Sequence, residues 1–178
     1  MLILMGGLPK SGKTVFAKAL AFRLGASLIS PDVVLPPGLE QFSEEKQKEL
    51  RIAAWKACQE STLEFCSKPK NVPKVAIFDT TGKNLRALEE LERMCSIRGH
   101  DLFFVYVHDT RERCGERGVG ESLLNEYFEV MKAPLQHFKN RLVVVKNEGS
   151  VEDLIDKAPM VEELCRSASN LKIPMTLP

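Results

Sequence analysis

Eight residues near the start of the chain have the types and spacing of a loop that cradles phosphate groups. They match the pattern G-x-x-x-x-G-K-T, and they lie between an apolar run at residues 2–5 and a helical pattern at 13–24. Glycines let such a loop turn tightly, so that backbone N–H groups and the positive end of the helix face the phosphates. The lysine then reaches the β- and γ-phosphates of a nucleotide, and the threonine hydroxyl is a ligand for Mg²⁺. The residues of this phosphate-binding loop are Gly7, Leu8, Pro9, Lys10, Ser11, Gly12, Lys13 and Thr14.

The expected nucleotide is ATP, because the chain lacks the N-K-x-D run that a guanine-specific switch usually carries. The run VVKN at residues 144–147 follows the last apolar run, where a base-binding loop could lie, but it has no aspartate in register. ATP and Mg²⁺ are therefore the cofactors that the sequence predicts.

Two carboxylates follow apolar runs that read as strands. Asp32 comes just after residues 27–30, and Asp79 ends the run at residues 74–79, directly before Thr80. In an open α/β sheet the carboxyl ends of the strands face the crevice where ligands bind. There Asp32 could accept the proton of a substrate hydroxyl, and Asp79 could hold a Mg²⁺-bound water or position the acceptor. Taken alone, Asp32 also fits a loop aspartate that accepts hydrogen bonds from local N–H groups.

A short helical pattern at residues 110–117 carries Arg113 and Arg117, which are one turn apart and share a face. Two glycines follow this pattern and could act as a hinge. Guanidinium groups on a mobile helix suit a lid that closes over a transferring phosphoryl group and excludes water. Because Glu112 and Glu116 alternate with the arginines, the same stretch also fits a salt-bridged surface helix.

Apolar runs alternate with longer helical patterns, which predicts an α/β fold with a five-stranded, mostly parallel sheet and helices on both faces. The expected strands lie at residues 2–5, 27–30, 74–79, 102–107 and 142–145. The expected helices lie at residues 13–24, 43–66, 84–98, 110–117, 121–138 and 150–158. A loop is expected at 31–38, and residues 167–178 are expected to form a loose tail. No linker or repeat divides the chain, so residues 1–178 are expected to form a single domain.

The composition is that of an ordinary globular protein, with 44% apolar residues, 28% charged residues and a net charge of +1. This balance does not indicate a nucleic-acid partner, although a local basic groove could exist. Five cysteines without a C-x-x-C pair indicate reduced thiols in a cytoplasmic protein rather than a zinc site or a disulfide framework. No apolar run approaches the roughly 20 residues of a membrane helix, so no membrane partner is expected.

The order of these parts resembles the polynucleotide 5′-kinase group of P-loop kinases, which is best known from phage repair enzymes. The resemblance runs from Leu2 to about Leu135 and includes the phosphate-binding loop, ISPD after the second strand and RERCGERG after the fourth. Its most specific parts are R-x-x-x-R-G and the pair Asp79-Thr80 with Arg86 downstream. The resemblance implies a P-loop kinase fold with a helical lid at about residues 109–138.

The resemblance also implies a role for each matching residue. Lys13 and Thr14 match the phosphate lysine and the Mg²⁺ hydroxyl, and Asp32 matches the general base that activates the acceptor hydroxyl. Arg113 and Arg117 match lid arginines, of which Arg117 would most directly touch the transferring phosphoryl group.

On the acceptor side, the resemblance implies substrate contacts from Asp79, Thr80 and Arg86, and Asp79 could also hold Mg²⁺ through water. The family usually has an arginine soon after the base, where it contacts a phosphate of the nucleic acid. This chain has the apolar run VVLP at residues 33–36 instead. The apolar run could help to form a pocket for a planar group.

The sequence therefore predicts an ATP-dependent kinase that phosphorylates a hydroxyl of a nucleic acid or nucleotide. The expected acceptor is a polynucleotide 5′-hydroxyl or a hydroxymethylpyrimidine in DNA, and a phage-encoded enzyme would act in the host cytoplasm. One alternative is a small-molecule or toxin-like nucleotide-sugar kinase, and another is an ATP-binding regulator that phosphorylates nothing. The oligomeric state is left open.

Overall fold

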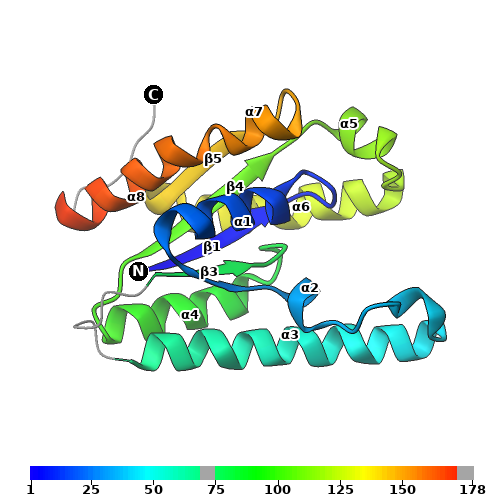
Figure 1. Cartoon of the computed structure of the whole chain (residues 1–178), viewed down its shortest axis with the longest axis horizontal. Helices are drawn as coiled ribbons and strands as arrows, with labels where there is room; N and C mark the ends of the chain where they lie inside the picture. The colour runs from blue at the N-terminus through cyan, green and yellow to red at the C-terminus, as the bar shows by residue number, and fades with distance from the viewer. Residues whose placement is uncertain (69–74, 172–178) are drawn as a thin grey trace.

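A computed structural model of the chain describes residues 1–68 and 75–171. Its strands form one sheet in the order β2-β3-β1-β4-β5, and each neighbouring pair is parallel (Figure 1). The strands are β1 (Leu2–Gly7), β2 (Ser27–Ile29), β3 (Ala76–Asp79), β4 (Leu102–His108) and β5 (Leu142–Lys146). The predicted five-stranded sheet is confirmed, and it is parallel throughout.

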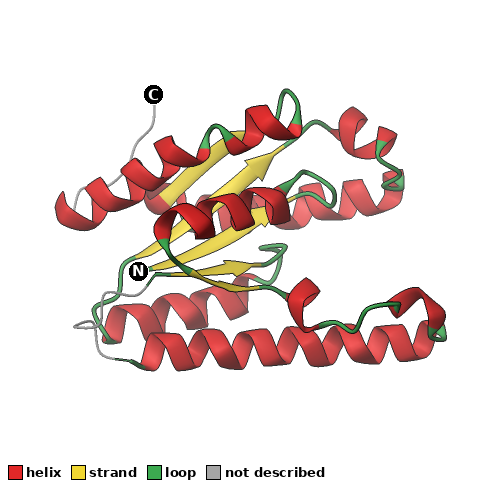
Figure 2. Ribbon diagram, in the orientation of Figure 1, coloured by secondary structure: helices red, strands yellow, loops and turns green. Residues whose placement is uncertain are grey.

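Helices connect the strands and cover the sheet above and below (Figure 2). They are α1 (Lys13–Leu24), α2 (Pro31–Val34), α3 (Glu44–Ser67), α4 (Leu85–Ile97), α5 (Arg111–Glu116), α6 (Glu121–His137), α7 (Val151–Ile155) and α8 (Ala158–Leu171). Two short 3-10 turns, η1 (Leu39–Gln41) and η2 (Lys139–Arg141), complete the elements. None of these helices combines the length and the apolarity that crossing a bilayer would require.

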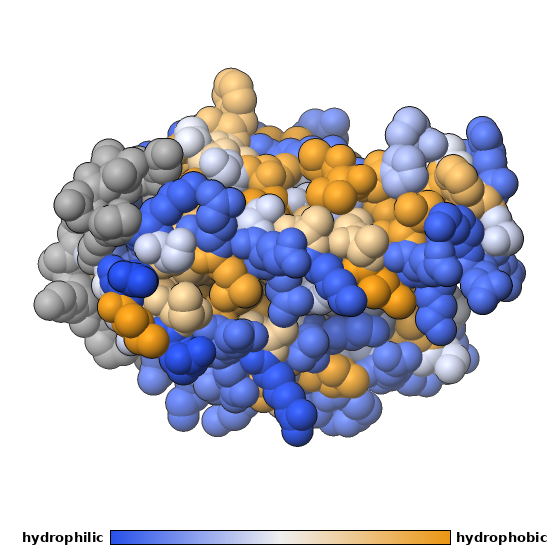
Figure 3. Space-filling model, turned by 90° about the horizontal axis from the view of Figure 1, so that it is seen from below, coloured by the Kyte–Doolittle hydropathy of each residue, from blue (hydrophilic) through white to orange (hydrophobic). Residues whose placement is uncertain are grey.

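The central strand β1 shows how the core is divided between the two faces of the sheet. Ile3 and Met5 pack with residues of α1, α7 and α8 on one face. Leu2 and Leu4 pack with residues of α3, α4 and α6 on the other. All four side chains are fully buried, as expected for a parallel strand that is covered on both sides. Polar side chains cover most of the outer surface of the lower layer, with apolar ones interspersed (Figure 3).

Local capping residues explain where several predicted helices begin and end. The Ser43 hydroxyl accepts a hydrogen bond from the Lys46 N–H before α3, and the Asn84 side chain accepts one from Ala87 before α4. Gly25 ends α1 in the left-handed conformation, at a φ of 60°. These boundaries agree with the sequence predictions.

Two expectations about the connections were wrong. Residues 31–38 were expected to be a loop, but the first four form α2, because Pro31 occupies the first helical position, where its fixed φ suits a helix. The loose tail was expected to begin at residue 167, but α8 continues to Leu171. Val161 and Cys165 anchor this helix, because they lie one turn apart in the core. The rest of the expected tail lies outside the described residues.

The expected lid at 109–138 is only partly peripheral. Leu8 of the phosphate-binding loop is fully buried within a small cluster of its own. The other members of that cluster come from α5, α6 and the turn between them, and are Cys114, Val119, Leu124 and Tyr127. Met131 and Phe138 instead belong to the main core below the sheet. The peripheral part of this region therefore ends near Tyr127, and it is docked on the phosphate-binding loop.

Candidate active site

The phosphate-binding loop between β1 and α1 is a tight cradle that only glycine permits at two positions. A Cβ atom on Gly7 would lie 2.6 Å from the Val107 carbonyl oxygen and 2.7 Å from Ser11 Oγ. Gly12 has a φ of +91°, and a Cβ atom there would lie 2.7 Å from Leu154 Cδ2. The hydroxyl of Ser11 is buried and has no hydrogen-bond partner within the described residues. A close backbone turn with an unpartnered buried hydroxyl fits a bound phosphate group.

The first turn of α1 adds positive potential to this cradle. Gly12 is the N-cap, and the turn contains no acidic residue that would offset the positive end of the helix dipole. Lys13 and Thr14 begin the helix, and both line a neighbouring cavity. The predicted strand, loop and helix are therefore in the arrangement that phosphate binding needs.

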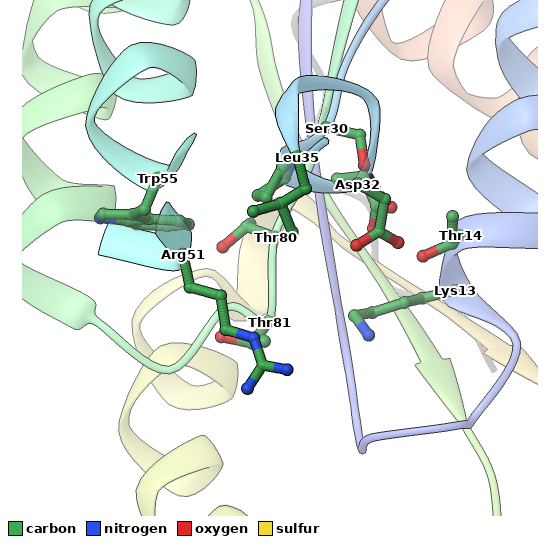
Figure 4. Close-up of a pocket in the computed structure, with 11 residues that line it drawn as sticks. Lys13, Thr14, Ser30, Asp32, Leu35, Arg51, Trp55, Thr80 and Thr81 are labelled. Carbon is green, nitrogen blue, oxygen red and sulfur yellow. Dashed lines mark hydrogen bonds between the residues drawn. The ribbon is translucent and has the colours of Figure 1, made fainter. Parts of the chain in front are cut away.

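A cavity of about 250 Å³ lies beside the phosphate-binding loop, at the carboxyl ends of β2 and β3. It brings together predicted site residues from three parts of the sequence, together with residues of α3 (Figure 4). The residues that line it are Lys13, Thr14, Ser30, Pro31, Asp32, Leu35, Arg51, Trp55, Asp79, Thr80 and Thr81. This is the crevice at strand ends where open α/β sheets bind ligands.

Asp79 is the buried carboxylate of this cavity, with 4% of its surface exposed. Its Oδ2 atom accepts a hydrogen bond of 3.2 Å from Ser30 Oγ, while Oδ1 has no hydrogen-bond partner within the described residues. Burial raises the pKa of the Asp79 carboxyl above its ordinary value, although the Thr14 hydroxyl and the Lys13 charge oppose the shift. An unpartnered carboxylate oxygen and a hydroxyl in one cavity are the hard oxygen donors that Mg²⁺ prefers. The two residues predicted to hold Mg²⁺ therefore fit that ion.

Asp32 lies in the first turn of α2, and its side chain is exposed to the cavity. Figure 4 shows its carboxylate directed toward Lys13 and Thr14. The side chain makes no hydrogen bond within the described residues, and the N–H of Val33 bonds to the Ser30 carbonyl instead. Asp32 is therefore not a loop aspartate that satisfies local N–H groups, and its oxygens are available to a ligand.

Arg117 joins the lid to the phosphate-binding loop through Asp109, which the sequence interpretation missed. The side chain of Asp109 is fully buried, and Arg117 Nη1 donates to its Oδ2 atom at 2.6 Å. Arg117 Nη1 also donates to the Lys10 carbonyl oxygen at 2.7 Å, and Lys10 Nζ donates to the Arg117 carbonyl oxygen. Asp109 follows β4 as Asp79 ends β3, so its position at a strand end was the signal that could have identified it.

Arg113 makes a second connection, to the loop that follows β5. Its Nη1 and Nη2 atoms donate to the carbonyl oxygens of Asn147 at 2.7 Å and Gly149 at 2.6 Å. Asn147 in turn donates to the Ser11 carbonyl oxygen at 2.9 Å and to Asp109 Oδ2 at 3.2 Å. Lid, phosphate-binding loop and β5 loop are thus held together by charged and polar groups.

Neither arginine lines the cavity. Both differ from the salt-bridged surface helix weighed as an alternative, because their carboxylate partner is the buried Asp109 rather than Glu112 or Glu116. Contact of Arg113 and Arg117 with a transferring phosphoryl group stays a prediction.

A family model described as an AAA domain matches residues 2–144, which is most of the chain. The chain belongs to this AAA-domain family. The match is to the family as a whole, and assignment to the polynucleotide 5′-kinase group within the P-loop kinases stays a prediction. A search of curated proteins found no match.

Solved structures that resemble this AAA-domain protein include several titled as kinases, all of low sequence identity. A gluconokinase from Sinorhizobium meliloti 1021 has a TM-score of 0.62 and 18% identity, over 96% of this chain and 94% of that chain. A shikimate kinase from Aquifex aeolicus has a TM-score of 0.57 and 18% identity, over 94% of this chain and 99% of that chain. A sugar kinase from Janibacter sp. has a TM-score of 0.55 and 13% identity, over 93% of this chain and 96% of that chain. The predicted P-loop kinase fold is therefore confirmed.

The acceptor side of this AAA-domain protein differs most from its sequence interpretation. Arg86 is exposed near the start of α4 and does not line the cavity. The ring of Trp55 packs against Phe78 with centroids 5.3 Å apart, and Trp55 also lines the cavity. Arg51 joins it from one turn earlier on α3, and the spacing of the two residues was the signal that could have paired them.

Proposed function

We propose that this protein is an ATP-dependent kinase that transfers the γ-phosphoryl group of ATP to a hydroxyl of a small molecule. The observation that carries the proposal is the cavity of about 250 Å³ in which Lys13, Thr14, Asp32 and Asp79 meet. The cavity is smaller than the 300–1,000 Å³ typical of sites for drug-sized ligands. Its size and its position beside the phosphate-binding loop suit a small acceptor next to the γ-phosphate.

The phosphate-binding loop would hold the donor. Its N–H groups, the Ser11 hydroxyl and the first turn of α1 would bind phosphate oxygens, and Lys13 would offset the charge on the β- and γ-phosphates. Thr14 and Asp79 would hold Mg²⁺, which supplies further neutralisation of the phosphate oxygens when bound. Because these groups are fixed by the fold before ATP arrives, little reorganisation would accompany the reaction.

Asp32 would act as the general base on the acceptor. Its carboxylate would take the proton of the acceptor hydroxyl while that oxygen forms a bond to the γ-phosphorus. The bond between the γ-phosphorus and the bridging oxygen breaks in the same transfer, and ADP leaves with that oxygen. The absence of a hydrogen bond to the Asp32 side chain within the described residues leaves both carboxylate oxygens free for this task.

Two observations support a small molecule over the nucleic-acid acceptor that was the first prediction. The solved structures of similar fold include proteins titled gluconokinase, shikimate kinase and sugar kinase. The residues after Asp32 are apolar and exposed, with Val33 66% and Val34 50% accessible, so they offer no charge to a nucleic-acid phosphate. The small-molecule alternative is therefore the better supported interpretation.

A screen of acceptor classes tests the proposal. The protein is incubated with ATP, Mg²⁺ and a pool of small hydroxyl compounds, and separately with plain and hydroxymethylated oligonucleotides, and the products are analysed by mass spectrometry. We expect one phosphoryl group to be added to a member of the small-molecule pool, and Lys13→Ala to abolish the addition. Phosphorylation of the oligonucleotides alone would support the nucleic-acid prediction, and release of free phosphate alone would support a regulatory ATPase.

A further inference from the structure

The end of the cavity formed by α3 has a different chemistry from the end beside the phosphate-binding loop. Figure 4 shows Arg51 and Trp55 on one side, and Lys13, Thr14 and Asp32 on the other. The phosphate end therefore contains the two carboxylates, whereas the α3 end contains a guanidinium and an indole. A ligand that spans the cavity meets carboxylates and Lys13 at one end, and a guanidinium without a carboxylate beside it at the other.

The guanidinium of Arg51 has no carboxylate partner in the described part of the chain. Its Nη2 atom makes one long hydrogen bond, of 3.4 Å, to the neutral Gln47 Oε1 atom, and it forms no ion pair within the described residues. Lys46 on the same helix is by contrast paired with Glu49 at 2.9 Å. A guanidinium presents several N–H donors in a planar fork that matches a carboxylate or a phosphate. Arg51 thus lines the cavity with a guanidinium that has no carboxylate partner in the described part of the chain.

Trp55 supplies a fixed apolar surface beside this charge. Its ring is held by Phe78 at a centroid distance of 5.3 Å and an interplanar angle of 31°. Leu35 contributes an apolar side chain to the same cavity. A rigid aromatic surface of this kind packs well against the carbon skeleton of a sugar-like or cyclic compound.

We infer that the acceptor is a small hydroxylated compound that carries a carboxylate or phosphate group, and that Arg51 binds this group while Trp55 packs against the carbon skeleton. The inference rests on the proposed function, because it places the reacting hydroxyl at Asp32. The guanidinium of Arg51 at one end and the base Asp32 at the other set the orientation, so the anionic group lies at Arg51 and the hydroxyl at the base. Arg51 is therefore the residue that selects anionic over neutral acceptors.

Kinetics with matched acceptors tests the selectivity. D-gluconate is compared with D-glucitol, its neutral open-chain counterpart, and glycerol 3-phosphate with glycerol, so that each pair differs in charge and the two pairs distinguish carboxylate from phosphate. We expect kcat/KM to be roughly ten- to hundredfold higher for the charged member of at least one pair. This ratio corresponds to the free energy that a hydrogen bond to a charged group usually contributes. Arg51→Gln should remove this preference mainly by raising KM, and Arg51→Lys should restore part of it. Lys56→Gln, which removes an exposed positive charge of α3 that does not line the cavity, should keep the wild-type values.

A binding measurement separates failure of this inference from failure of the proposed function. Trp55 is the single tryptophan of the chain, so intrinsic fluorescence reports directly on the α3 end of the cavity without any turnover. The charged probe should change the fluorescence of the wild-type protein at concentrations roughly ten- to hundredfold below those needed for its neutral counterpart or for Arg51→Gln. Charge-selective binding without phosphoryl transfer would overturn the proposed function, but it would still support an anion-binding site at Arg51. Equal responses to charged and neutral probes, or none to either charged probe, would overturn the inference.

Discussion

The two halves of the active site differ in how their charged groups are satisfied. On the donor side, buried Asp109 accepts hydrogen bonds from Arg117 and Asn147, and Arg113 binds the loop after β5. On the acceptor side, Asp32 makes no side-chain hydrogen bond and Arg51 forms no ion pair within the described residues. The lid network around Asp109 is thus completed by the protein itself, whereas the acceptor side has charges without a protein partner in the described part of the chain.

This difference indicates which half supports the fold and which half serves the reaction. Removal of a group from a buried, paired network leaves its partners unsatisfied and destabilises the protein. Removal of an exposed, unpaired charge affects stability little. Substitutions in the lid network around Asp109 should therefore lower stability, and those at the unpaired charges of the acceptor side should change activity alone.

The largest expected effect separates activity from stability at Asp32. Asp32→Asn should lower kcat for phosphoryl transfer by about 10²- to 10⁴-fold, the usual contribution of a general base. The free energy of unfolding should change by less than about 0.5 kcal/mol, because the side chain is exposed and makes no hydrogen bond. Initial rates with labelled ATP and denaturant unfolding measure the two quantities. Glu40→Gln, an exposed acid of η1 outside the cavity, is the control. A loss in kcat of less than tenfold would show that Asp32 is not the base.

Lys13→Ala should have the next largest effect on activity, and it tests the donor side directly. Loss of a charged group that stabilises the transferring phosphoryl oxygens should lower kcat by about 10²- to 10³-fold. Lys18→Ala, on the exposed face of the same helix, should retain wild-type rates. Similar rates for the two variants would exclude the assigned role of the phosphate-binding loop.

Asp109→Ala, unlike Asp32→Asn, should lower the stability of the protein. Removal of the Asp109 side chain takes away the carboxylate that accepts hydrogen bonds from Arg117, Asn147 and the Thr110 N–H, so the free energy of unfolding should fall by about 1.5–3 kcal/mol. Chemical denaturation measures this loss, and Glu116→Ala, an exposed residue of α5, should cause almost none. If Asp109→Ala were as stable as wild type, the donor-side network would not support the fold.

The smallest expected effect concerns the pH dependence of stability at Asp79. Burial raises the pKa of this carboxyl above its ordinary value of 3.8, so the folded state binds its proton more tightly than the unfolded state. The contribution of Asp79 to stability is therefore greatest below pH 3.8 and is lost as the pH rises through the folded-state pKa. Without Mg²⁺, Asp79→Asn should become more stable relative to wild type as the pH is raised to neutrality. A difference that is independent of pH would contradict the assigned effect of burial.

The donor side was predictable because its signal is local in sequence. The strand, the glycine spacing and the lysine–threonine pair are contiguous within residues 2–14, so the whole motif can be recognised in one short stretch of sequence. The five strands were likewise predictable, because a sheet covered on both faces requires continuous apolar runs. The connection through α2 was not, because a proline-rich segment fits both a loop and the first turn of a helix.

The partners of the charged side chains could not be predicted from the same patterns. The spacing of Arg113 and Arg117 places them on one helix face, but their shared carboxylate is the buried Asp109 at the end of β4. The spacing of Arg51 and Trp55 also predicts a common face, but only the packing of α3 beside β3 directs that face into the cavity. The packing of one element against another, which helical spacing does not describe, decides both cases.

The fate of the γ-phosphoryl group tests the central claim most directly. Wild-type protein is mixed with γ-labelled ATP, Mg²⁺ and the best acceptor from the screen. The amounts of label in the phosphorylated acceptor and in inorganic phosphate are then measured. We predict that most of the label appears on the acceptor hydroxyl, and that Asp32→Asn lowers its rate of transfer by at least two orders of magnitude. Label found in inorganic phosphate alone, at the same rate in both proteins, would contradict the account.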